Sequence, residues 1–129
     1  AAEAARQTRM AKNKEALDLA NRTLAANPND TQALCTAAWI LAASPFQELR
    51  DGKRAVKLAE IACSLLHEKD PYALAVLGVA QAEYGSFRRA IDATTRAAAL
   101  YEQIGEHVKA DALTSRVSLF KQNKSYRDE

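Results

Sequence analysis

The chain has 129 residues, enough for one domain with a sizeable core, and 18 Lys and Arg against 16 Asp and Glu give a formal net charge of +2. This near balance gives no electrostatic case for nucleic acid, and no run reaches the roughly 18 apolar residues of a membrane span. We therefore expect neither nucleic acid nor a membrane as a partner. The start lacks the features of a signal peptide and begins in mid-helix without a methionine, so we expect a fragment of a larger protein. The compartment stays unknown, with the cytoplasm favoured for this domain.

Hydrophobic residues make up 48% of the chain but aromatics only 6%, and alanine supplies much of the difference. This composition favours closely packed helices over sheets. The first expected helix, residues 3–11, reads as the trailing part of a hairpin arm with a weak interruption at Asn13. A second stretch of apolar residues at helical spacing ends at Asn27-Pro28, because proline cannot continue a helix. Asn29 and Gln32 then form a capping box before a helix over residues 31–43.

Further start and stop signals divide the remainder of the chain. Ser44 as N-cap with Pro45 predicts a short helical turn, which ends at Asp51-Gly52. Helices are then expected over 53–66, from Pro71 to the break at Gly85, and from 87 to 103 or 104. After a break at Gly105, a last helix covers 106–122, and we expect the polar tail 123–129 to fray.

The predicted helices repeat at nearly constant spacing. Ala55 and Ala90 are 35 residues apart, whereas Leu34 and Leu74 are 40 apart. About five extra residues inserted within 44–52 account for the longer spacing, which places the period near the 34 residues of a helical-hairpin repeat.

The pattern resembles the tetratricopeptide repeat family. In the third repeat, Leu77-Gly78 matches the Leu-Gly pair of the family's first arm, and Gly85 with Phe87 matches its turn. Further matches are Ala90, Ile91 and Ala97, and in the second repeat Ala37, Ala38, Ala55, Val56 and Ala62. Three aromatic positions of the family are not aromatic here. Its first-arm Trp is Leu34 or Leu74, its first-arm Tyr is Leu41 or Gln81, and its second-arm aromatic is Ala59 or Thr94.

The resemblance implies an all-α fold, a right-handed α-solenoid of antiparallel helical hairpins with a C-terminal capping helix. Its units are a partial first repeat (1–28), a second repeat (30–68) with the inserted turn 44–52, a third repeat (70–104) and the capping helix (106–122). Another α-solenoid or a plain helical bundle is the alternative.

A tetratricopeptide-like array implies a non-catalytic module that binds a protein or peptide on its concave face. The residues that the family's register places there are Gln32, Cys35, Thr36, Trp39, Tyr72, Ala75, Val76, Val79 and Glu83. The Lys, Arg and Asn clamp with which some members hold a peptide carboxylate is missing. Trp39 and Tyr72 are the candidate anchors, although Trp39 fits a core position equally well.

Several alternatives remain open at this stage. The insert 44–52 is either a turn whose Phe46 and Leu49 cover the end of a hairpin or an added binding loop. Cys35 and Cys63 are expected to be two buried thiols, or a disulfide if their helices pair, and no spacing fits a metal site. Basic residues at 88–89, 121, 124 and 127 form a solvated face or a minor site for phosphate or acidic peptides. We expect no catalytic residue and no cofactor, and self-association through the N-terminal repeat edge is the second functional hypothesis.

Overall fold

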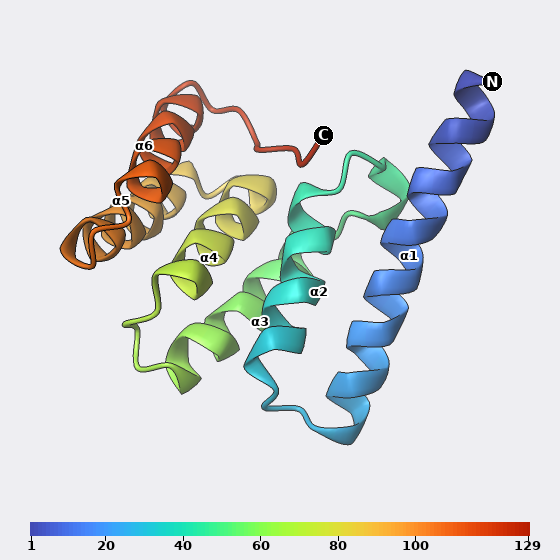
Figure 1. Cartoon of the computed structure of the whole chain (residues 1–129), viewed down its shortest axis with the longest axis horizontal. Helices are drawn as coiled ribbons and strands as arrows, with labels where there is room; N and C mark the ends of the chain where they lie inside the picture. Colours follow the sequence, from blue (N-terminus) through green and yellow to red (C-terminus); the bar gives the residue numbers. More distant parts are fainter.

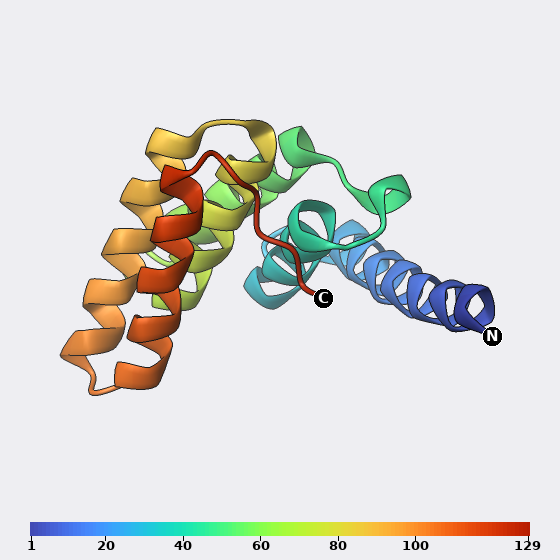
Figure 2. The same ribbon diagram turned by 90° about the horizontal axis from the view of Figure 1, so that it is seen from above.

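A computed structural model describes all 129 residues and is all-α, as expected, with six α-helices and one short 3₁₀ helix (Figure 1). The elements are α1 (Ala2–Ala26), α2 (Thr31–Ala43), η1 (Gln47–Leu49), α3 (Gly52–Leu65), α4 (Pro71–Tyr84), α5 (Phe87–Gln103) and α6 (His107–Lys121). Each α-helix packs on the next along the chain, and α2 also packs on α4. Figure 2 shows the helices as a bent row, with residues 122–129 crossing from the end of α6 toward α2.

Aspartate side chains begin three of the helices. The carboxylates of Asp30, Asp51 and Asp70 accept hydrogen bonds from the backbone N–H three residues later, at 2.8 to 3.1 Å. The expected capping box of Asn29 and Gln32 is therefore wrong by one residue, because Asp30 is the N-cap of α2. The proline start of α4 is confirmed, with Pro71 in its first turn.

Helix α1 is continuous through the position where a break was expected. Asn13 lies inside it, and its side-chain Nδ2 donates to the backbone carbonyl of Arg9, four residues earlier. Neither Gly nor Pro stands between residues 1 and 26, so nothing interrupts the backbone ladder. The separate helix over 3–11 was a wrong prediction.

The inserted turn forms differently from its expected start signal. Ser44 is the C-cap of α2 rather than the N-cap of a new turn, and its hydroxyl oxygen accepts from the backbone N–H of Phe46. The 3₁₀ helix η1 follows Phe46, whose side chain is only 4% exposed. The guanidinium carbons of Arg6 and Arg9 lie 5.3 and 5.8 Å from its ring centroid, so α1 covers this turn.

A small residue lets α4 and α5 approach each other closely. A Cβ on Gly78 would lie 2.2 Å from the Thr94 hydroxyl oxygen, so only glycine fits this crossing. The predicted breaks at Gly85 and Gly105 are both confirmed, since α4 and α5 end there and both residues have positive φ, at 97° and 80°.

The tail does not fray, contrary to expectation. Residues 124–129 are non-helical, yet Ser125, Tyr126 and Arg127 are half-buried against the helices. The backbone N–H of Asp128 donates to the carbonyl of Ala43 at 2.8 Å. The tail is therefore held by tertiary contacts, which a polar composition does not reveal.

Candidate peptide-binding face

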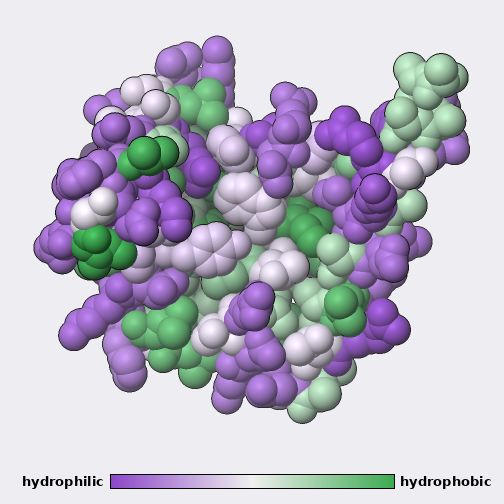
Figure 3. Space-filling model, in the orientation of Figure 1, coloured by the Kyte–Doolittle hydropathy of each residue, from purple (hydrophilic) through white to green (hydrophobic).

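The surface where residues 125–128 lie is formed by α2, α4 and α6, and we call it the inner face. Its main side chains are Trp39 of α2, Tyr72 and Glu83 of α4, and Arg116 of α6. Figure 3 shows paler, less hydrophilic atoms over the middle of this side of the molecule, framed by hydrophilic residues. Such a surface, apolar in its centre and polar at its rim, is typical of peptide recognition.

Arg127 and Asp128 of the tail complete the C-terminal end of α2. The last four carbonyls of a helix have no partner within it. Those of Ile40 and Leu41 accept from the backbone N–H of Ser44 and Asp51. The carbonyl of Ala42 accepts from Arg127 Nη1 at 3.4 Å, and that of Ala43 from the backbone N–H of Asp128. Half of the orphan carbonyls of α2 thus depend on the tail.

Glu83 lies between two arginines from distant parts of the chain. Its Oε1 is 2.7 Å from Arg127 Nη1, and its Oε2 is 3.6 Å from Arg50 Nε. The first contact is an ion pair without a well-aligned hydrogen bond. Arg50 also donates to the carbonyl of Ser44 at 2.8 Å, so both guanidinium groups face the C-terminal end of α2, where the helix dipole favours positive charge.

Two aromatic rings and one guanidinium group form the other half of the inner face. The ring centroids of Trp39 and Tyr126 are 5.6 Å apart, and the guanidinium carbon of Arg116 lies 4.3 Å from the Tyr126 centroid and 5.5 Å from that of Trp39. Burial lowers the pKa of Arg116, an effect that the neighbouring Tyr126 opposes. The indole N–H of Trp39 donates to Asp128 Oδ2 at 2.8 Å. Trp39 therefore packs partly on the core while its polar edge binds the tail.

A hollow of ≈140 Å³ adjoins this cluster, and seven of its nine lining residues are hydrophobic. Four predicted site residues meet in it, namely Trp39, Tyr72, Ala75 and Val76, together with Tyr101, Lys109, Ala112, Leu113 and Arg116. Tyr72 is 50% exposed, and partial burial raises the pKa of its hydroxyl.

Of the other predicted site residues, Glu83 lies on the inner face, and the remaining four lie beside or beneath it. Gln32 and Thr36 line a separate hollow beside α1, and Gln32 also borders one with Cys35 and Tyr72. Cys35 is 3% exposed and Val79 is fully buried. Gln32 and Tyr72 each border two of these hollows, whereas buried Val79 borders none of them. The sequence-based set omitted Arg50, Arg116 and the tail residues Ser125, Tyr126, Arg127 and Asp128, since nothing local marks them as neighbours of Trp39.

Both cysteines are free and buried. Burial raises the pKa of the Cys35 thiol to about 11 and that of Cys63 to about 12. The expectation of two buried thiols is confirmed, and neither is a reactive thiolate at neutral pH.

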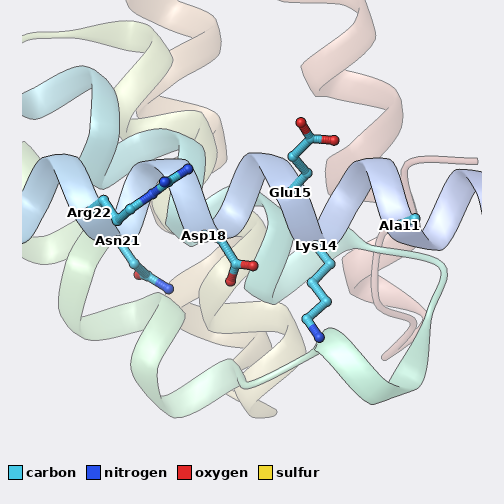
Figure 4. A pocket seen from close by; sticks show the side chains of 6 residues that line it. All are labelled: Ala11, Lys14, Glu15, Asp18, Asn21 and Arg22. Carbon is cyan, nitrogen blue, oxygen red and sulfur yellow. The ribbon is translucent and has the colours of Figure 1, made fainter.

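A larger hollow of ≈630 Å³ runs along α1, and Figure 4 shows the six residues that line it. All six come from this one helix, and the side chains of Lys14 and Glu15 point in different directions from it. One of them, Asn21, accepts a hydrogen bond from Arg54 of α3 at 2.8 Å. A surface furnished by one helix encloses no ligand, so the inner face is the stronger candidate.

No group of three or more His, Cys, Asp or Glu side chains is placed to hold a metal ion. None of the helices is both long and apolar enough to cross a membrane. Comparison of the chain with protein-family models, with curated proteins and with solved structures gave no match.

Proposed function

We propose that this chain is a non-catalytic protein-interaction module that binds a peptide or partner helix on its inner face. In this proposal the helix row is a right-handed α-solenoid of tetratricopeptide-like hairpins, and α6 is its capping helix. The contact of α2 with α4 supports it, because first arms of successive hairpins are neighbours in such an array. The glycine at the α4–α5 crossing supports the hairpin register.

One observation carries the proposal: the inner face holds a stretch of extended chain in the way that a receptor holds a peptide. Ser125, Arg127 and Asp128 all bond to backbone carbonyls of α2 or α4. Trp39 and Glu83 supply side-chain contacts on either side of that stretch. Asp128 bonds through its main chain, whereas Ser125 and Arg127 bond through their side chains, so side-chain contacts make most of this binding.

A selection from a random peptide-display library on the full chain tests the proposal. We expect the selected peptides to lose binding to a chain carrying Trp39→Ala and Tyr72→Ala. A chain carrying Ile61→Ala, which removes an apolar side chain that is 43% exposed on α3, should bind them normally. Peptides that bind all three chains equally would dismiss the inner face as the binding surface.

Self-association is the second candidate, supported by the side of α1 that no other helix covers. Leu19 is 59% exposed there and borders the hollow between α1 and α2. Pairing of two copies through this side would bury it. Light scattering at high concentration should then show a dimer that Leu19→Lys abolishes, whereas a monomer throughout would exclude this candidate.

A further inference from the structure

Residues 125–128 lie on the inner face as a ligand lies on a receptor. Their hydrogen-bond partners in α2 and α4 are 43 to 89 residues away in the sequence. None of these four residues is part of the buried core, whose last member is Phe120 in α6. Tyr126 packs against the edge of the core, so removal of the tail exposes the inner face and this edge but no fully buried core residue.

Three consecutive residues of the tail meet three different chemical environments. The ring of Tyr126 lies beside the Trp39 indole, with the Arg116 guanidinium close to both rings. Arg127 meets the Glu83 carboxylate and a helix-terminal carbonyl. Asp128 receives the indole N–H of Trp39. The face thus offers places for an aromatic ring, a guanidinium group and a carboxylate, in that order along the chain.

We infer that the inner face selects an extended peptide in which an aromatic residue, an arginine and an aspartate follow one another, and that Tyr126–Asp128 occupies this site until such a partner displaces it. The inference rests on the proposed function and names its ligand. The second place requires a cationic donor, because one nitrogen, Arg127 Nη1, faces both the Glu83 carboxylate and the carbonyl of Ala42.

Occupation by the tail sets the affinity for any partner. A partner sees only the fraction of molecules whose inner face is open, and its apparent Kd rises in inverse proportion to that fraction. If the tail is docked about nine-tenths of the time, a free peptide binds the intact chain about tenfold more weakly than an opened one. A short tether gives an effective concentration in the millimolar range, so the tail is a strong competitor.

The test compares the full chain with a full-length variant carrying Tyr126→Gly, Arg127→Gly and Asp128→Gly. The probe is a synthetic peptide with the sequence of residues 122–129, QNKSYRDE. Trp39 is the only tryptophan, so its indole N–H gives one resonance in a ¹⁵N spectrum and reports the site directly. We expect the peptide to return this resonance in the variant toward its wild-type position and to bind the variant about tenfold more tightly.

Controls separate recognition from non-specific contact. Introducing Glu83→Gln into the variant should weaken peptide binding, whereas Glu60→Gln, on the exposed side of α3, should not. A peptide with alanine at the position of Arg127 should bind less well than the parent. Should circular dichroism show that the triple variant is unfolded, the single variant Arg127→Ala provides the same comparison.

Two outcomes would overturn the inference. One is a Trp39 indole resonance that stays unchanged in the folded variant up to about 5 mM peptide, above the effective concentration of a short tether. The other is equal affinity of wild type and variant for the peptide. If the display selection still yields inner-face ligands that lack the aromatic–arginine–aspartate order, the proposed function stands and only this inference fails.

Discussion

Substitution of Gly78 by alanine tests the close crossing of α4 and α5, which sets the position of Tyr72 and Glu83. The new Cβ would lie 2.2 Å from Thr94 Oγ1 and 3.2 Å from the carbonyl oxygen of Ala90. Thr94 is fully buried, so its side chain cannot turn out into solvent. Overpacking of this kind costs about 1–3 kcal/mol, and so severe an overlap belongs at the upper end. Alanine has a higher helix propensity than glycine, which offsets about 1 kcal/mol of this cost. We expect Gly78→Ala to lower the free energy of unfolding by about 2 kcal/mol.

The same geometry predicts that Thr94→Ala rescues this variant. The Thr94 hydroxyl is buried and has no hydrogen-bond partner, so its loss removes a desolvation penalty of about 1–3 kcal/mol. This gain offsets the cavity left by the methyl group, about 1 kcal/mol. In the Thr94→Ala background, Gly78→Ala should therefore be neutral or slightly stabilising, which corresponds to a coupling of about 2 kcal/mol.

Urea unfolding followed by circular dichroism measures all four corners of this cycle. Thr95→Ala is the matched control, because Thr95 is the exposed neighbour of Thr94 in α5 and reports helix propensity without a clash. The reasoning is refuted if Gly78→Ala stabilises the wild-type chain, or if it costs the same with and without Thr94.

Three further predictions concern the inner face and the core beneath it. Arg127→Ala should lower the free energy of unfolding by about 1 kcal/mol, and by less in a Glu83→Gln chain, because both changes remove the same partly buried ion pair. A urea double-mutant cycle measures this difference, and equal losses in the two chains would contradict the prediction. Burial raises the pKa values of Cys35 and Cys63 from 9.0 to about 11 and about 12. Because the thiols of the unfolded chain lose their protons at lower pH, the free energy of unfolding should fall as pH rises from 9 toward 11. Urea midpoints across this range should depend less on pH when both cysteines are replaced by alanine. Asp70→Ala should cost about 1 kcal/mol in urea unfolding through the lost N-cap of α4, while Asp70→Asn should cost clearly less.

Local signals in the sequence predicted the helix ends well where a single residue determines the backbone conformation. Helix α2 spans the expected residues 31–43, and the glycines at 85 and 105 end α4 and α5. Where two adjacent residues can serve, the sequence does not choose between them. Asn29 and Asp30 are both good N-caps, and the structure uses the second.

The candidate site was less predictable, because its residues meet only through tertiary contacts. Trp39 and Glu83 were expected on the inner face from the repeat register, and both contact the tail. The tail itself has no apolar periodicity, so its composition resembles that of a frayed end. The bond between Trp39 and Asp128 joins residues 89 positions apart. No pattern in a short window could have shown it.

The inserted turn and the tail solve one structural problem together, the open end of α2. The turn supplies the backbone N–H of Asp51 to Leu41 and Arg50 to Ser44, while the tail supplies the remaining donors to Ala42 and Ala43. The turn lies between two core helices, α2 and α3, whereas residues 125–128 follow the last helix and add no member to the buried core cluster. A donor from another peptide can therefore replace the contribution of the tail but not that of the turn. Because Arg50 stays beside Glu83 during such an exchange, the carboxylate keeps a partner, which lowers the cost of releasing Arg127. The turn between α2 and α3 is thus what makes exchange at the inner face physically reasonable.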